Sequence, residues 1–175
     1  MADIKRKPIR GLIADMKKLL SKEEYGVALA APQVGEPLRI FIVSGRAVAR
    51  DKRNAPDEPT SPDVEARSSL ARRSLGEDGK LKALPDQVYI NPELAKLSRS
   101  KKQKNEGCLS IRGKWGTVPR AEKATIRAYD ERGVRFTRGA SGFLAHVFQH
   151  EMDHLEGVLY TDKATHVYDE EKSKQ

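Results

Sequence analysis

The hydrophobic positions near the start of the chain recur at helical spacing. From Ile9 to Leu20 the apolar residues lie three or four positions apart, which predicts an amphipathic helix with one face packed on the body of the protein. We expect this helix to end before Gly26. A second stripe of this kind runs from Phe143 to Leu155 and predicts another helix, with Gly157 placed where such a helix stops.

Between these helices, apolar and alternating runs predict β-strands. The expected strands are Leu38–Val43, a run starting at Val88, Gly116–Arg120, Ala124–Tyr129, and residues 134–138 after a turn at 130–133. The basic stretch Lys96–Lys104 fits a hairpin tip or a nucleic-acid contact, and we favour the hairpin tip. Residues 158–162 are interpreted as a further short strand. The successive strands from 116 to 138 indicate a β-meander.

Residues 45–86 have a different character, because polar residues dominate and no apolar period is sustained. We interpret this segment as an exposed insertion. The charged residues from Asp169 onward predict a frayed tail. The whole chain, 1–175, is expected to form a single domain that contains the insertion.

Composition narrows the class of protein. Of the 175 residues, 38% are hydrophobic and 33% charged, which argues against a wholly disordered chain. The single cysteine excludes a disulfide-stapled secreted protein, and no apolar run reaches the length of a membrane span. The N-terminal residues are read as mature protein, so we expect a cytoplasmic location, with an organelle as the alternative. The net charge of +8 favours an anionic partner such as RNA.

The segment His150–His154 has the form H-E-x-x-H. On a helix, histidines at i and i+4 share one face and are able to meet a single divalent metal ion, and Glu151 between them is suited to accept a proton from a metal-bound water. The pattern also arises by chance as two ordinary helix histidines with surface carboxylates. A third protein ligand would decide between these readings.

The usual third ligands are tested in turn. Tyr160 occupies the position where the metzincin pattern needs a histidine, and the 21 residues after His154 lack the helical pattern that would carry a carboxylate ligand. His146 lies too far along the helix axis from His154, about 12 Å of rise, so it is interpreted as a pocket wall or a core histidine. Cys108 remains, either as a thiolate ligand or as a buried structural thiol.

Three segments match the motifs of one family in order along the chain. The sequences GVALAAPQ (26–33), EGCLS (106–110) and QHEMDHLEG (149–157) resemble those of peptide deformylases, which remove the formyl group from the initiator methionine of nascent chains. This resemblance implies an α+β fold, with antiparallel strands around a central metal-binding helix. It also implies Cys108, His150 and His154 as ligands of one metal ion, with iron(II) as the usual native metal and zinc, nickel or cobalt as substitutes.

The resemblance also implies roles for other residues. Glu151 transfers the proton, while the Gln33 side-chain amide and the Leu109 backbone N–H stabilise the negative oxygen of the tetrahedral intermediate. Glu106 is expected to act as a positioning residue, with Arg120 as a cation able to pair with it. The candidate substrate-binding residues are Gly26, Val27, Ala28, Glu106, Gly107, Phe143 and His146.

Ala28 departs from the family pattern, which has glycine at this position, and we expect its methyl group to crowd the substrate. The implied partners are formylmethionyl nascent peptides, with transient ribosome association through the basic surface, no membrane, and a monomeric state. Two alternatives stay open on the residues: a zinc-dependent peptidase built on the same H-E-x-x-H motif, and a basic RNA-binding protein with a vestigial metal site.

Overall fold

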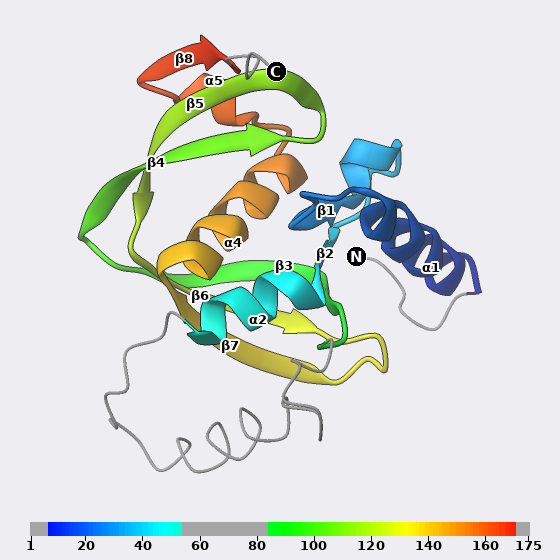
Figure 1. Cartoon of the computed structure of the whole chain (residues 1–175). Helices are drawn as coiled ribbons and strands as arrows, with labels where there is room; N and C mark the ends of the chain where they lie inside the picture. Colours follow the sequence, from blue (N-terminus) through cyan, green and yellow to red (C-terminus); the bar gives the residue numbers. More distant parts are fainter. Residues whose placement is uncertain (1–6, 54–83, 171–175) are drawn as a thin grey trace, which may run out of the picture.

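A computed structural model describes residues 7–53 and 84–170 of the chain. Helix α4 lies between two antiparallel sheets, a five-stranded sheet of order β1-β2-β3-β6-β7 and a three-stranded sheet of order β4-β5-β8 (Figure 1). The helical elements are α1 (Lys7–Lys22), η1 (Ala31–Val34, a 3-10 helix), α2 (Gly45–Arg53), α4 (Gly142–Leu155) and α5 (Tyr160–Lys163). The strands are β1 (Ala28–Ala30), β2 (Ile40–Val43), β3 (Gln87–Leu97), β4 (Lys101–Cys108), β5 (Ile111–Ala121), β6 (Lys123–Tyr129), β7 (Arg135–Ser141) and β8 (His166–Asp169).

The five-stranded sheet is covered on both faces. The apolar stripe of α1 packs on one face, where Met16 and Leu20 meet Leu29 of β1. On the other face α2 and α4 pack on the alternate strand residues that point to that side, including Ala28 and Ala30. Successive residues of a strand point to opposite faces, so the run of apolar residues in β1 and β2 reflects burial from both sides. The helices predicted at 9–20 and 143–155 are confirmed, and Gly157, with φ of 72°, follows the end of α4.

The basic stretch Lys96–Lys104 is not a hairpin tip, and that prediction is wrong. Strand β3 runs on into β4, and β5 runs on into β6, as one long antiparallel pair that bends from one sheet into the other. At the bend, the Ser98 N–H donates to the Lys123 carbonyl and the Glu122 N–H donates to the Ser100 carbonyl at 3.0 Å. The tip that joins β4 to β5 is at residues 109–110, beside the predicted cysteine ligand.

The predicted insertion at 45–86 is shorter than expected, because its first residues form α2. Ala47 and Val48 are buried in the cluster shared with α4, so two apolar residues on one helical face were enough to dock this short helix. The rest of that prediction, residues 54–83, lies outside the described residues. The Gly45 N–H donates to the Asp86 carboxylate at 2.9 Å, so the segment leaves the sheet and returns to it at the same place.

Two predictions near the C-terminus also need correction. Residues 158–162 do not form a strand, because α5 begins at Tyr160, whose ring is buried against Gly116 and whose hydroxyl donates to the Lys114 carbonyl at 3.0 Å. Asp169 does not begin a free tail, because it ends β8 and pairs with the Lys114 ammonium at 2.7 Å. Residues 171–175 of the predicted tail lie outside the described residues. Within the described part of the chain, no helix is long and apolar enough to span a membrane.

Gly45 gives a test of the contact between the two ends of the 45–86 segment. A Cβ at Gly45 would lie 1.6 Å from the Leu84 carbonyl oxygen. We therefore expect Gly45→Ala to lower the free energy of unfolding by about 1 to 3 kcal/mol, as overpacking does. Gly11 in α1 is the matched control, since a Cβ there meets nothing within 4 Å and alanine favours the helix. Urea denaturation of both variants measures the difference, and equal stabilities would contradict the close approach.

Candidate active site

Three ligand atoms converge where α4 faces the end of β4. The ligand atoms of Cys108, His150 and His154 all lie within 4.8 Å of one another. The Cys108 Sγ is 3.2 Å from the His154 Nε2, and the two imidazole centroids are 4.8 Å apart with nearly perpendicular rings. The i, i+4 spacing places both histidines on one helical face, and the end of β4 supplies the sulfur from the opposite side.

The chemistry of these donors fits a divalent metal ion. Burial opposes ionisation of the Cys108 thiol, but hydrogen bonds with His150 and His154 outweigh burial and lower its pKa to about 5. A thiolate with two imidazoles is a donor set typical of zinc or iron sites that keep a position open for substrate. The cluster therefore offers one soft and two borderline ligand atoms to such an ion.

Glu106 fixes the orientation of one of these rings. Its Oε2 lies 2.9 Å from the His150 Nδ1. Burial disfavours the charged carboxylate, but hydrogen bonds from Arg120 and His150 outweigh it and lower the Glu106 pKa to about 2. An ionised carboxylate only accepts, so the His150 Nδ1 carries the hydrogen and its Nε2 is left for a metal ion.

Arg120 holds Glu106 from behind. Its Nε and Nη2 donate to the two Glu106 oxygens at 2.7 and 2.8 Å, and its Nη1 donates to the Asp153 carboxylate at 2.6 Å. The guanidinium is almost fully buried, so each of its charged contacts is shielded from water. The sequence suggested the Arg120–Glu106 pair, which is confirmed, whereas the role of Asp153 was missed.

Gln149 was missed as well. This buried residue exchanges two hydrogen bonds of 2.9 Å with the backbone of Ala121, and so fixes α4 against the junction of β5 and β6. Gln149 and Asp153 both lie inside the third motif, on faces of the helix that the apolar stripe leaves to polar residues. A polar residue in a buried helix needs a hydrogen-bond partner, and this requirement is the sequence signal that could have identified Gln149 and Asp153.

Glu151 is a buried glutamate with an unpaired carboxylate oxygen. It is 3% exposed, and within the described residues its Oε2 is the only buried side-chain oxygen or nitrogen with no hydrogen bond. Burial raises the pKa of Glu151 to about 7. A carboxyl group that is near half-ionised at neutral pH is well placed to accept and return a proton.

Gln33 connects the two sheets at the site. Its Oε1 accepts from the Ala30 N–H of β1 at 2.8 Å, and its Nε2 donates to the Cys108 Sγ at 3.4 Å and to the Ser110 hydroxyl at 3.0 Å. Leu109 is partly buried in the cluster under α1, which anchors the β4–β5 tip. Both residues therefore lie beside the ligand cluster, while their catalytic roles stay predictions.

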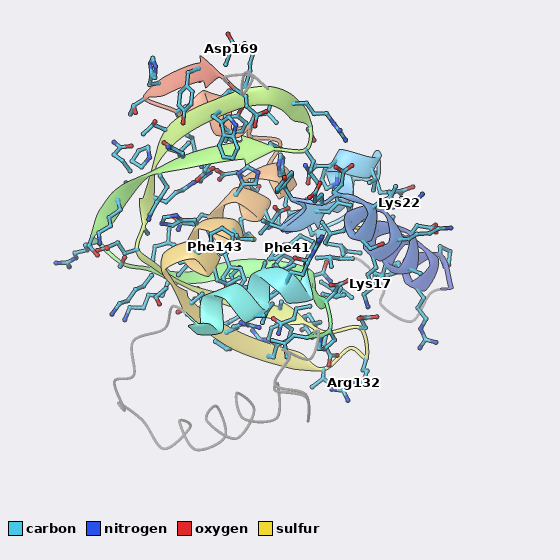
Figure 2. All side chains as sticks on the ribbon, in the orientation of Figure 1. Lys17, Lys22, Phe41, Arg132, Phe143 and Asp169 are labelled. Carbon is cyan, nitrogen blue, oxygen red and sulfur yellow. The ribbon has the colours of Figure 1, made fainter. Side chains whose placement is uncertain are left out.

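The expected wall residues lie around the start of α4. Val27 and Phe143 pack on the cluster between α4 and the sheet, which also contains Phe41 (Figure 2). His146 lies one turn before His150 and is buried. Burial lowers its pKa, so the ring is neutral at physiological pH.

One of the candidate substrate contacts, Ala28, has other surroundings than expected. The Ala28 methyl group packs in the cluster between β1 and α4, so it points into the core and does not crowd the exposed edge of β1 as expected. Gly26 follows the end of α1, where a Cβ would lie 2.8 Å from the Glu23 Cβ. Gly107 is exposed on β4 directly before the cysteine ligand.

The chain as a whole is similar to known proteins. A family model described as polypeptide deformylase matches residues 1–170. The chain belongs to this family. Metal-dependent removal of an N-formyl group is the known activity of polypeptide deformylases, and the chain has their mixed architecture of helices and antiparallel sheet.

Individual relatives show how far the similarity extends. The peptide deformylase of Desulforudis audaxviator is 33% identical over 82% of this chain and 70% of its own length, and that of Symbiobacterium thermophilum is 37% identical over 93% and 62%. The structure of Arabidopsis thaliana peptide deformylase 1B with an inhibitor superposes with a TM-score of 0.68 at 30% identity, covering 94% of this chain and 72% of that one. The chain thus spans from about three fifths to seven tenths of these relatives.

Arg120 is the residue whose loss should loosen the site most without touching a ligand. Arg120→Met leaves Glu106 buried without its main partner, so His150 is no longer held, and we expect metal affinity to fall by about 10- to 100-fold. Competition with a chelator measures this affinity. Arg112→Met is the matched control, because Arg112 is largely exposed and pairs with Glu23 at the surface. Unchanged affinity in Arg120→Met would show that the carboxylate orients the ring without help.

Proposed function

We propose that this chain hydrolyses the N-formyl group of formylmethionyl nascent peptides, releasing formate. The observation that carries the proposal is Glu151, a buried carboxyl group with an unpaired oxygen, next in sequence to one residue of the ligand cluster. A cluster that served only to stabilise the fold would gain nothing from an unpaired buried oxygen. A hydrolytic site needs one, because a water must be deprotonated there.

Cys108, His150 and His154 would hold the metal ion, one per chain. When bound, such an ion supplies Lewis acidity, lowering the pKa of a water molecule and polarising the formyl carbonyl. Iron(II) is proposed as the native metal, with zinc, nickel or cobalt as substitutes. The support is the mixed sulfur and nitrogen donor set, which all of these ions accept.

The chain's own residues complete the reaction. Glu151 accepts the proton of the attacking water at its free oxygen and returns it to the leaving amine nitrogen. The Gln33 amide and the Leu109 N–H are proposed donors to the negative oxygen that develops on the formyl group. Gln33 is suited to this because its amide oxygen is already fixed by the Ala30 N–H, so the direction of its NH₂ group is set.

The peptide itself is proposed to lie between the two sheets. Strand β1 is the edge of the five-stranded sheet, β4 is the edge of the three-stranded sheet, and Gln33 bonds to both beside the ligand cluster. An extended peptide pairs readily with an exposed strand edge. The methionine side chain would then point toward α4, among Val27, Phe143 and His146, with Ala28 and Gly107 contributing backbone.

The test of the function is formate release from formyl-Met-Ala-Ser by protein purified without oxygen. Glu151→Gln keeps the size of the side chain and removes the base, so we expect turnover to fall by at least about 100-fold while the metal is retained. Cys108→Ala should lose most of the tightly held metal, as measured by elemental analysis. Normal turnover by Glu151→Gln would remove its proposed role, and cleavage of unformylated peptides would favour a peptidase instead.

The identity of the metal gives a separate prediction. Iron(II) and an adjacent thiolate are both open to oxidation by dioxygen, whereas zinc and nickel are not oxidised under these conditions. We expect the iron-loaded protein to lose activity in air much faster than the zinc- or nickel-loaded protein, with equal half-lives under argon. Paired half-life measurements check this, and an iron form that is equally durable in air would contradict an oxygen-accessible site.

Ribosome association, a monomeric state and a cytoplasmic location are proposed as the setting of this activity. The support for the first is the bend between the two sheets, where Arg99, Lys101 and Lys104 are all exposed. Clustered exposed cations attract the phosphates of RNA at a strength that falls as salt rises. The bend lies on the strand pair that carries Cys108, so a contact with RNA there would bring the site near the nascent chain.

A further inference from the structure

The Trp115 ring packs on Gly107, the residue before the cysteine ligand. A Cβ built on Gly107 would be in van der Waals contact with the ring, 3.4 to 3.5 Å from three of its atoms. The indole of β5 therefore rests over the bare backbone of β4. Strand β4 is the edge of the three-stranded sheet, so the ring lies on an edge strand.

The indole is on the face of the sheet turned away from the metal ligands. Glu106 and Cys108 point toward α4, where they contact His150 and His154. Side chains alternate along a strand, so Gly107 and the ring above it belong to the opposite face. Trp115 is still 36% exposed there, although Tyr168 of β8 stands directly across from it.

A peptide extended along β4 meets both faces in turn. If the formylmethionine side chain points toward α4, the side chain of the next residue points the other way, toward the face that carries the indole. This step rests on the proposed function and on the proposed placement of the peptide. The second residue of the substrate is then the one whose side chain lies beside Trp115.

We infer that Trp115 determines specificity for the residue that follows formylmethionine, favouring large apolar side chains. An indole offers a broad apolar surface, and contact with leucine or phenylalanine buries area that glycine does not supply. The preferred class is therefore apolar, ahead of glycine.

The experiment compares kcat/KM for formyl-Met-Gly-Ser, formyl-Met-Leu-Ser, formyl-Met-Phe-Ser and formyl-Met-Lys-Ser with metal-loaded full-length protein. We expect leucine and phenylalanine to exceed glycine by about three- to tenfold, less than a closed apolar pocket gives because the indole covers one side only. The gain should lie mainly in KM. Trp115→Thr should abolish the preference while leaving the glycine peptide nearly unchanged, and Trp115→Phe should keep part of it.

Tyr168→Ala is the matched control, since Tyr168 is an aromatic residue one strand farther from the edge of β4. It should keep the wild-type preference. Equal losses for all four peptides in both Trp115 variants would assign the ring a purely structural role, and an undiminished preference would also overturn the inference. If Trp115→Thr does not fold, the Trp115→Phe ratio decides. Failure of the wild type to release formate from any of the peptides would instead overturn the proposed function, and the inference with it.

Discussion

The buried guanidinium of Arg120 joins the parts of the molecule on which the site depends. It bonds to Glu106 on β4 and to Asp153 on α4, so a single side chain sets the distance between the strand that carries the sulfur and the helix that carries the imidazoles. Removing such charges from water costs several kcal/mol per ion, which is recovered only when each hydrogen finds a partner in good geometry. The hydrogen bonds of Arg120 therefore need good geometry. They hold β4 and α4, which carry the three ligands, in a fixed position relative to each other.

The two glutamates of the site differ in their hydrogen-bond partners. Glu106 is buried with Arg120 and His150 and stays ionised, whereas Glu151 is buried with one oxygen unpaired and has a pKa raised to about 7. The same carboxyl group thus serves as a fixed anchor in one place and as a proton carrier in the other. Burial alone does not decide between these roles, because both residues are almost fully buried.

Much of this arrangement could be predicted from the sequence, and the errors show what local sequence patterns do not contain. The long stripes of α1 and α4 and the ordered motifs predicted the two helices, the family and the side chains that cluster at the site, because each signal repeats over several turns or several residues. The short helices were not predicted. Helix α2 has a single buried pair, Ala47 and Val48, in a polar segment. Helix α5 is one turn long, which is too short to show a helical period. The prediction for the bend between the sheets was wrong because a strand pair that passes from one sheet to the other has the composition of a loop.

Contacts made across the fold were the least predictable. Nothing local to Asp153 or Gln149 reveals that one meets Arg120 and the other the backbone of Ala121, since those partners lie about thirty residues away in sequence. Ala28 illustrates the same limit in reverse. Its place in the motif suggested an exposed contact, while its parity in β1, set by pairing with Val43, turned the methyl group into the core.

The closure at Gly45 and Asp86 has a consequence for how the chain tolerates change. Because the two ends of the segment are clamped together by the folded body, the strands on either side keep their register whatever lies between the ends. The entropy of closing such a loop grows only with the logarithm of its length, by roughly 0.6 kcal/mol per doubling. Natural or engineered sequences of very different length, even a whole inserted domain, are therefore compatible with an intact catalytic centre at this one position of the chain.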